Sequence, residues 1–296
     1  MNAPIALFVY NRPWHTKKTV DALKENKLAQ KSKLFIFSDA PKEKKQAAEV
    51  RKVREYIKSI SGFKDVAIFE HKENLGLAEN IIHGVSKLVN EYGRVIVLED
   101  DLVTSPWFLN FMNDALNMYQ DEERVASVHG YVYPIENLPE SFFIRGADCW
   151  GWATWKRAWD KFEKNGKVLL DEIQNRNIQK EIDFNHSYNF TQMLKDQIKG
   201  KNDSWAVRWY ISTFLDGMLT LYPGQTYVLN IGIDGSGQHS KQNDVYRSKL
   251  NKNKKLKKIN IEENKFAREK FEVFFRKINR GYLEKLFIKI KSFLLA

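Results

Sequence analysis

Short apolar runs alternate with longer amphipathic stretches along the first hundred residues. The apolar runs are rich in Val, Ile, Leu and Phe without polar alternation, as expected of strands covered on both faces. They occupy residues 4–10, 33–37, 66–70 and 94–98. Helices are predicted between them, at residues 16–23 and 42–59 and in a stretch ending at residue 89. Because strands separated by helices form right-handed crossovers, this pattern predicts a mainly parallel sheet flanked by helices.

The fourth apolar run ends in three adjacent acids, Glu99, Asp100 and Asp101. Ligands of open α/β sheets bind at the carboxyl ends of the strands. Three neighbouring carboxylates repel one another unless a cation or sugar hydroxyls offset their charge, and hard divalent ions prefer oxygen ligands. The triplet therefore indicates a metal site. The alternative is a solvated acidic turn before a helix that begins near Ser105 and Pro106.

Two other predicted strands also end in polar residues suited to a nucleotide. Tyr10, Asn11 and Arg12 follow the first strand, and Asp39 follows the second. The guanidinium of Arg12 can bind a base or a phosphate, and Asp39 can accept hydrogen bonds from a base edge or a ribose. The alternatives are a surface salt bridge and an ordinary turn. No G-x-G-x-x-G or P-loop lysine is present, so the usual dinucleotide and ATP motifs are absent.

Composition limits the class of protein. The 296 residues are 43% apolar and 13% aromatic, enough for a sizeable core. Cys149 is the single cysteine, which excludes a disulfide framework and fits a reducing compartment. The N-terminus lacks a signal-peptide pattern, and no run reaches the ~18 apolar residues of a spanning helix. We therefore expect a cytoplasmic protein.

The net charge of +11 is confined to the end of the chain. Residues 241–296 carry 17 Lys and Arg against 6 Asp and Glu, which leaves 31 of each sign in residues 1–240. A nucleic-acid-binding protein would be expected to carry basic charge on its folded body as well. No nucleic acid is therefore predicted as a partner.

The charged tail is also predicted to be helical. After a basic linker, residues 266–296 read as one or two amphipathic helices with a break near Gly281. Their apolar positions follow helical spacing: Phe271, Phe274, Phe275, Ile278, Tyr282 and Leu286. A helix with this stripe and basic flanks suits an anionic membrane surface. The alternative is a helix docked on its own domain or on a second subunit, through which the chain could form oligomers.

Four segments resemble, in matching order, the motifs of GT-A fold glycosyltransferases. They are residues 10–13, 38–39, 74–77 and 98–102. The Glu-Asp-Asp-Leu motif followed by Pro and aromatic residues most resembles the N-acetylglucosaminyltransferase I group, and the chain is also similar to bacterial family-2-like sugar transferases. The resemblance covers residues 4–240. It implies a Rossmann-like GT-A domain at 1–240, followed by the tail at 241–296.

The same resemblance implies roles for the residues at the strand ends. Asp101 would be the direct ligand of Mn²⁺ or Mg²⁺, which joins it to the diphosphate of a UDP-sugar. Asp100 and Glu99 would face the ribose and the donor sugar. Arg12 and Asp39 would hold the uracil end, with Tyr10 and Asn11 beside them.

The second half of the chain contains a tryptophan-rich stretch at 146–159. At least two of its indoles are expected in the core. Indoles also stack on the C–H faces of sugars. The resembled family has a Gly-Trp turn beside the donor sugar, which assigns Gly151 and Trp152 to the sugar pocket.

Asp203 is the candidate catalytic base. It lies where a helix is predicted to begin, so its alternative role is to cap that helix. In the resembled family an Asp next to a Trp, with an Arg nearby, takes the proton from the acceptor hydroxyl. Here Ser204 separates Asp203 from the Trp, which leaves Asp196 and Asp216 as alternatives.

A glycine-rich loop at 232–240 contains His239. Three glycines make a backbone that can close over a ligand. The resemblance implies that His239 helps to bind the metal or the diphosphate, and the alternative is a solvated side chain.

Together these features predict an inverting, metal-dependent glycosyltransferase that transfers a hexosyl or N-acetylhexosaminyl group from a UDP-sugar. The acceptor would be a glycan or lipid-linked glycan of the cell surface, reached from the inner face of the cell membrane, where the tail would attach the enzyme peripherally. The alternatives are a nucleotidyltransferase on a similar sheet and a non-catalytic sugar-binding or membrane-scaffold protein.

Overall fold

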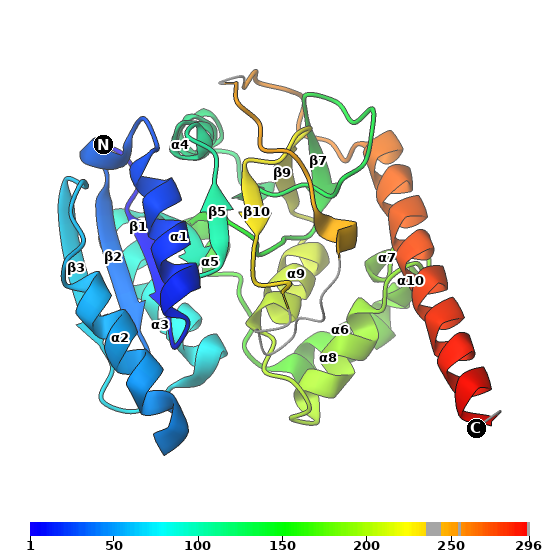
Figure 1. Ribbon diagram of the computed structural model, residues 1–296. Coiled ribbons are helices and arrows are strands. Elements are labelled where there is room, and N and C mark those ends of the chain that lie inside the picture. Colours follow the sequence, from blue (N-terminus) through cyan, green and yellow to red (C-terminus); the bar gives the residue numbers. More distant parts are fainter. Residues whose placement is uncertain (235–243, 254–255, 295–296) are drawn as a thin grey trace.

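An eight-stranded sheet crosses the centre of the molecule (Figure 1). The computed structural model describes residues 1–234, 244–253 and 256–294, with residues 280–294 described by their backbone alone. The strands lie in the order β3-β2-β1-β4-β8-β6-β9-β7. Their bounds are β1 Ile5–Val9, β2 Lys33–Ser38, β3 Asp65–Glu70, β4 Arg94–Glu99, β6 Val125–His129, β7 Ser141–Arg145, β8 Trp152–Trp155 and β9 Leu219–Pro223.

The first four strands are parallel, and β8 and β7 run against the others. A separate antiparallel pair joins β5 (Leu102–Thr104) to β10 (Val228–Asn230). The α/β fold class with a mainly parallel central sheet, expected from the GT-A resemblance, is confirmed. The four strands predicted in the first hundred residues are confirmed as β1 to β4.

Helices cover both faces of this sheet (Figure 1). Their bounds are α1 Pro13–Lys24, α2 Ala47–Ile57, α3 Gly76–Tyr92, α4 Phe108–Met118, α5 Lys156–Trp159, α6 Gly166–Arg176, α7 Gln179–Ile182, α8 Phe190–Ile198, α9 Trp205–Leu215 and α10 Lys265–Leu294. Short 3-10 turns lie at Ala29–Lys31, Lys44–Gln46 and Asp244–Tyr246. The helix predicted at 42–59 is therefore shorter, because its first turn is a 3-10 turn. Among the described residues, no helix is long and apolar enough to cross a membrane.

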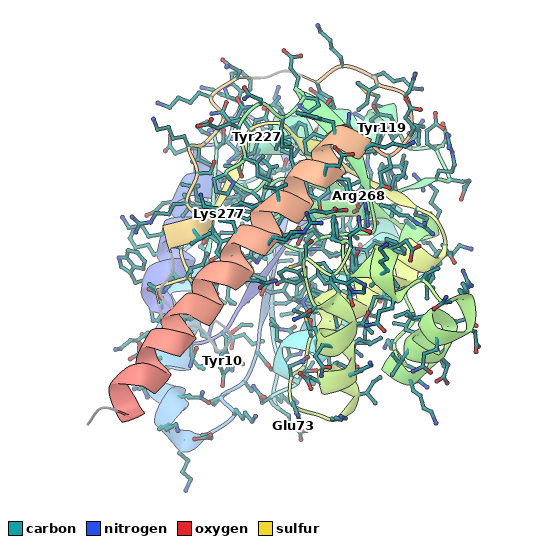
Figure 2. The ribbon with its side chains drawn as sticks, turned by 90° about the vertical axis from the view of Figure 1, so that its right-hand side faces the viewer. Tyr10, Glu73, Tyr119, Tyr227, Arg268 and Lys277 are labelled. Carbon is teal, nitrogen blue, oxygen red and sulfur yellow. The ribbon has the colours of Figure 1, made fainter. Side chains whose placement is uncertain are left out.

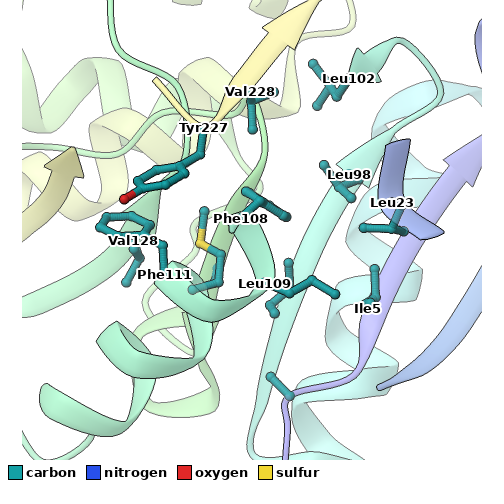
Figure 3. Close-up of a cluster of buried hydrophobic side chains, with 14 of the residues drawn as sticks. Ile5, Leu23, Leu98, Leu102, Phe108, Leu109, Phe111, Val128, Tyr227 and Val228 are labelled. Atoms are coloured by element: carbon teal, nitrogen blue, oxygen red, sulfur yellow. The ribbon is translucent and has the colours of Figure 1, made fainter. Parts of the chain in front are cut away.

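Successive residues of β1 pack into different cores, because side chains alternate across a strand. Ile5, Leu7 and Val9 pack with α1, α2 and α4 on one face, as part of Figure 3 shows. Ala6 and Phe8 pack with α3 and with tryptophans of α5 and α9 on the other face. Burial on both faces explains the uninterrupted apolar runs in the sequence.

A third core joins the C-terminal helix to the domain. Phe271 and Phe275 of α10 are 1% exposed and pack with residues of β7, β9 and α6 to α9. Figure 2 shows α10 crossing one side of the molecule. The prediction that this apolar stripe faces a membrane is wrong for these two residues, because the rest of the domain buries them. Of the one or two helices predicted for the tail, the structure has one, because α10 is continuous across Gly281.

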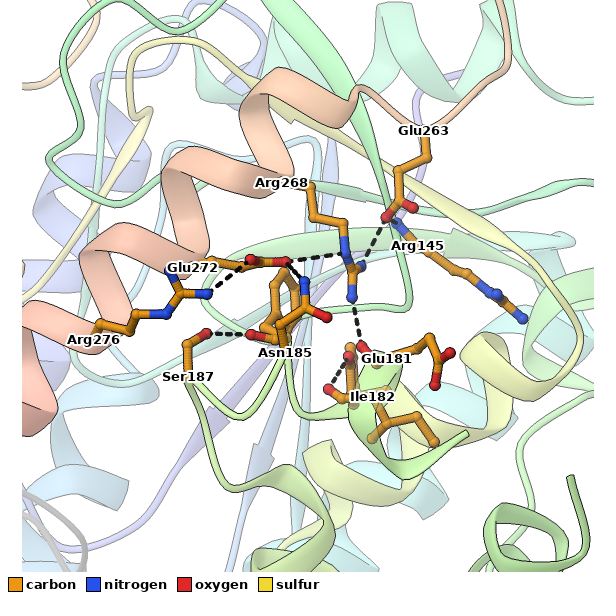
Figure 4. Close-up of polar contacts among 11 residues, drawn as sticks. Arg145, Glu181, Ile182, Asn185, Ser187, Glu263, Arg268, Glu272 and Arg276 are labelled. Atoms are coloured by element: carbon orange, nitrogen blue, oxygen red, sulfur yellow. Dashed lines mark hydrogen bonds and ion pairs between the residues drawn. The ribbon is translucent and has the colours of Figure 1, made fainter. Parts of the chain in front are cut away.

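Charged groups fix the same helix to the domain (Figure 4). Glu272 is 6% exposed and accepts a 2.6 Å hydrogen bond from Asn185, while Arg276 lies 3.2 Å from it. Arg268 pairs with Glu263 at 3.0 Å, and Glu263 also accepts a bond from the backbone N–H of Arg145. Residues 256–279 therefore pack against the domain formed by the preceding chain. The boundary proposed at residue 240 stays a prediction.

This packing predicts that Phe271→Ala destabilises the whole fold. A fully buried Phe truncated to Ala typically costs about 3–5 kcal/mol, because transfer and cavity terms add. Urea denaturation of the full chain measures the change, with Phe266→Ala as the control because Phe266 lies on the same helix and is 48% exposed. Equal, small effects of the two substitutions would mean that α10 is not docked in solution.

Candidate functional site

The ends of three adjacent strands bring the acidic triplet together with the residues that follow β1 and β2. Phe8 of β1 is in register with Glu99 of β4, and Val9 is in register with Ser38 of β2. β1, β2 and β4 all end at this edge of the sheet. The structure therefore gathers the strand-end residues of the sequence analysis, as the parallel topology requires.

Arg12 binds two of the three acids directly. Its Nη2 atom contacts Asp100 Oδ1 and lies 2.8 Å from Asp101 Oδ2. Burial would lower the pKa of Arg12, but the charges of Asp100 and Asp101 outweigh burial and raise it. The guanidinium predicted to hold the uracil end thus acts as a counterion of the acids in this structure. Its contact with a nucleotide stays a prediction.

One guanidinium does not neutralise the triplet. Burial, together with the charges of Asp101 and Asp100, raises the pKa of Glu99 to about 8. Burial also raises the pKa of Asp100 to about 6, although Arg12 opposes the shift. The Oδ2 atom of Asp100 is buried and accepts no hydrogen bond from the described residues. A buried carboxylate oxygen without a partner indicates a missing cation or donor.

Asp101 is the acid best placed to hold a divalent cation. Its side chain is 14% exposed, whereas that of Asp100 is 5% exposed. Within the described residues no group of three His, Cys, Asp or Glu could hold a metal. Mg²⁺ sites that serve phosphates use one or two carboxylates and complete their shell with phosphate oxygens and water. The donor set therefore fits a cation that binds together with a diphosphate. His239 lies outside the described residues.

The backbone of residues 231–232 lies in close contact with Asp101 and Arg12. The N–H of Ile231 donates to the carbonyl of Asp101 at 2.9 Å. A Cβ at Gly232 would lie 2.1 Å from Asp101 Oδ2 and 2.9 Å from Arg12 Nη1. Only glycine leaves both side chains where they are.

Asp39 accepts four hydrogen bonds from nearby protein groups. Its Oδ1 accepts bonds from the N–H groups of Ala40 (2.8 Å) and Leu75 (2.9 Å). Its Oδ2 accepts bonds from Gly76 N–H (2.9 Å) and the side chain of Asn74 (3.0 Å). Four donors occupy a carboxylate that is 4% exposed. Asp39 therefore fixes the loop that starts α3, and its predicted bond to a base or ribose stays a prediction.

Arg54 of α2 is a site-supporting residue that the sequence analysis missed. It donates to the carbonyls of Ser38 (3.4 Å), Asp39 (3.3 Å) and His71 (2.7 Å) at the ends of β2 and β3. Its spacing from the buried Val50 and Ile57 places it on the packed face of the helix. The feature of the sequence that could have identified Arg54 is its position on the apolar face of the predicted helix.

Tyr10 and Asn11 lie at the same edge, directly after β1. The hydroxyl of Tyr10 donates to Gln46 Oε1 at 2.7 Å and accepts the N–H of Lys42 at 2.9 Å. These bonds tie the turn after β1 to the turn before α2. The predicted contacts of both residues with the donor stay predictions.

Asp203 is exposed and lies beside the loop that Asp39 fixes. Ser204, not Asp203, caps α9, since its side chain accepts the N–H of Val207 at 3.2 Å. A Cβ at Gly76 would lie 3.4 Å from Asp203 Oδ2. The capping alternative is therefore wrong, and the carboxylate is adjacent to the start of α3, at the ligand edge of the sheet.

The two alternative bases are less well placed. Asp196 lies 3.6 Å from Lys201 and accepts a bond from Gln192. Asp216 follows the last residue of α9, 3.7 Å from Lys161. Eleven helical residues span about 16 Å, so Asp216 lies at the far end of the helix from Asp203.

The assignment of Trp152 to a sugar pocket is corrected. Its side chain is 0% exposed, and its ring centroid lies 5.3 Å from that of Trp205 and 5.9 Å from that of Trp209. An indole enclosed by protein cannot stack on a sugar. The packing explains why residue 151 is a glycine: its φ is +67°, and a Cβ there would lie 2.7 Å from Val228. The partly exposed indole of this stretch is Trp150.

No protein-family model matches the chain, and no curated protein matches its sequence. Solved structures with a similar fold include a mannosyltransferase from Pyrobaculum calidifontis in complex with GDP-Man and Mn²⁺ (TM-score 0.31, 16% identity). That alignment covers 45% of this chain and 36% of the mannosyltransferase.

Another is S. aureus TarS 1–349 in complex with UDP (TM-score 0.33, 12% identity). Its alignment covers 47% of this chain and 38% of TarS. The chain thus spans less than two fifths of either structure, and both likenesses concern the fold alone.

The close approach of Gly232 predicts that Gly232→Ala displaces Asp101 while the fold survives. The added methyl group forces the Asp101 carboxylate away from Arg12, because their atoms cannot overlap. We expect Mn²⁺-dependent binding of UDP, measured by calorimetry, to weaken at least about tenfold, or ~1.4 kcal/mol.

Gly93→Ala is the control, since Gly93 has a φ of +76° but its Cβ would meet open space. It tests backbone strain without touching the acids. Unchanged UDP binding in Gly232→Ala would contradict the position assigned to Asp101.

Proposed function

We propose that the protein is an inverting, metal-dependent glycosyltransferase that moves a sugar from a UDP-sugar to a glycan acceptor. The observation that carries the proposal is the incompletely neutralised pair Asp100 and Asp101 at the ligand edge of the sheet. A site that offers one partly exposed carboxylate, that of Asp101, beside a guanidinium suits a diphosphate bound with a cation. The resemblance to GT-A glycosyltransferases supports the same reading.

Donor binding is assigned to the strand ends. Asp101 would hold Mn²⁺ or Mg²⁺, which offsets the charge of the leaving diphosphate when it is bound. Arg12 would share its guanidinium between the acids and a phosphate oxygen. Glu99 and Asp100 would face the donor ribose and sugar, and His239 would assist at the diphosphate.

Asp203 is assigned to proton transfer. The acceptor hydroxyl oxygen forms a bond to the anomeric carbon while the bond from that carbon to the diphosphate oxygen breaks, and Asp203 takes the hydroxyl proton. UDP leaves from the opposite face. A single displacement of this kind converts an α-linked donor into a β-linked product. Asp203 is suited to the task because it is exposed beside the start of α3.

These assignments predict opposite defects for two substitutions. Asp101→Ala should abolish metal-dependent UDP binding, because the cation loses its protein ligand. Asp203→Asn should leave UDP binding nearly intact and lower turnover by about 10²- to 10⁴-fold, as loss of a general base does. Calorimetry measures binding, and product formation by anomeric NMR measures turnover and stereochemistry.

Asp196→Asn and Asp216→Asn are matched controls for the loss of a carboxylate at Asp203. Wild-type turnover in Asp203→Asn would eliminate it as the base. Metal-dependent UDP binding without turnover on any sugar donor would favour the non-catalytic alternative.

We also propose that the outer part of α10 attaches the enzyme to an anionic membrane, where a lipid-linked glycan acceptor would lie. The support is the charge of residues 241–296 and the continuation of α10 beyond its docked part. Each basic residue near an anionic leaflet contributes about 1 kcal/mol, and the effect fades within a Debye length.

The corrected packing changes how this attachment is tested. Removing residues 266–296 would remove Phe271 and Phe275 from the core, so the informative truncation removes residues 280–296. We expect the truncated chain to keep UDP binding and to lose co-sedimentation with phosphatidylserine vesicles. Phosphatidylcholine vesicles are the control. Undiminished sedimentation of the truncated chain, or none for the intact chain, would refute the attachment.

A further inference from the structure

The loop between β7 and β8 reaches the acidic triplet from the side opposite Arg12. Val97 of β4 pairs with Trp152 of β8 in antiparallel register, which carries Trp150 toward Glu99 at the end of β4. A Cβ at Gly151 would lie 3.4 Å from Leu98, consistent with this path. Asp148, Cys149 and Trp150 are partly exposed there. β4 therefore has Arg12 on its β1 side and this loop on its β8 side.

The loop is held in one conformation. Gly146 has a φ of +91°, and a Cβ there would lie 2.3 Å from the ring of Tyr210. The carbonyl of Gly151 accepts the N–H of Gly130 at 2.6 Å. The N–H of Trp150 donates to Nε2 of His129 at 3.0 Å. A loop fixed at both ends and in the middle presents its side chains without further ordering.

Asp148 is a carboxylate held in place inside this loop. Its Oδ1 accepts the N–H of Cys149 at 2.8 Å, and its Oδ2 accepts the hydroxyl of Tyr222 at 3.3 Å. Nδ1 of the fully buried His129 faces the same oxygen at 3.8 Å and makes no hydrogen bond. Since Nε2 accepts a bond, Nδ1 carries the proton of a neutral ring. The side chain of Asp148 remains 25% exposed.

A group of packed aromatic rings begins at Trp150, two residues after Asp148. The ring of Trp150 lies 4.8 Å from that of Tyr131 and 5.7 Å from that of Tyr246, centroid to centroid. Tyr133 continues the group at 6.3 Å from Tyr246 and packs on Phe274 of α10 at 5.2 Å. Trp150, Tyr133 and Tyr246 remain partly exposed. A pyranose ring has an apolar face of C–H groups and a rim of hydroxyls, which this mixture of rings and one carboxylate matches.

Packing of α10 alone does not account for the group. It explains why Tyr133 contacts Phe274, but it does not explain a partly exposed carboxyl group in the loop beside these rings. The oxygens of Asp148 already accept bonds from Cys149 and Tyr222, and the exposed part of the side chain can accept further bonds from sugar hydroxyls.

We propose that Asp148 and Trp150, with Tyr133 and Tyr246, bind the pyranose ring of the acceptor. Hydroxyls of the ring donate to Asp148, and its C–H face packs on Trp150. Calling the ring the acceptor rests on the proposed function, because the nucleotide is assigned to the β1 side of β4. The donor's own sugar shares this chemistry, so the experiment separates the two sources.

The test compares the full-length wild-type chain with Asp148→Asn and Trp150→Ala. We expect the acceptor KM to rise at least about tenfold in each, while kcat and the donor KM change less than about threefold, because the interaction binds substrate without entering the reaction. Trp150→Phe should recover part of the loss. Asp160→Asn and Phe266→Ala are matched controls, since Asp160 pairs with Lys156 at the surface and Phe266 is 48% exposed.

The outcomes are separable. A rise in the donor KM alone would assign the group to the donor sugar and overturn the acceptor assignment. Unchanged kinetics in both variants would overturn the site altogether.

If the wild-type protein transfers no sugar, the proposed function fails, and the sugar site is judged by direct binding. Saturation-transfer NMR with methyl β-glucoside, methyl β-galactoside and methyl β-N-acetylglucosaminide then provides the measurement. A signal lost in Asp148→Asn and kept in Asp160→Asn would support a sugar site, and no signal from any glycoside would overturn it.

Discussion

The contact between Arg12 and the two aspartates at the end of β4 is the interaction on which the candidate site depends. Three acids follow one another at the end of a buried strand, and burial together with repulsion among them raises the pKa of Glu99 and of Asp100. Arg12 reaches them because β1 lies directly beside β4 in parallel register. Thr19 of the helix that follows donates to the carbonyl of Asp100 at 2.8 Å, so the same turn is held twice. One guanidinium against the two aspartates leaves a net negative charge, which is the physical reason to expect a cation at this site.

A second constraint connects this edge to the candidate base. Asp39 accepts three of its four hydrogen bonds from residues at the start of α3, and Arg54 donates to carbonyls at the ends of β2 and β3. The start of α3 in turn lies against Asp203. Neither Asp39 nor Arg54 needs to touch a substrate to matter, because they fix the strand ends and the start of α3, beside which Asp203 lies.

The sequence predicted what depends on local periodicity and on parallel topology. Uninterrupted apolar runs identified β1 to β4, and the carboxyl-edge rule then brought Arg12 and the acidic triplet to one place. Partners far apart in the chain could not be predicted in this way. Arg12 and Asp100 are separated by 88 positions, and three of the four donors to Asp39 lie 35 to 37 residues away. Four indoles close together also gave no signal to distinguish buried Trp152 from partly exposed Trp150, because every residue of β8 is buried.

The C-terminal tail is another part of the chain whose partners the sequence could not predict. Helical spacing located the apolar stripe of α10 but not the surface that covers it, which is the third core of the domain. Through Phe274, Tyr133, Tyr246 and Trp150 that core continues as packed rings to the loop beside Glu99. The C-terminal helix is thus one wall of the region assigned to the acceptor. Because α10 is a single helix, its docked half also fixes the direction of its basic outer half. A membrane bound by the outer half would then have a defined orientation relative to Asp148 and Trp150, so that attachment and acceptor binding would be set by the same rigid element.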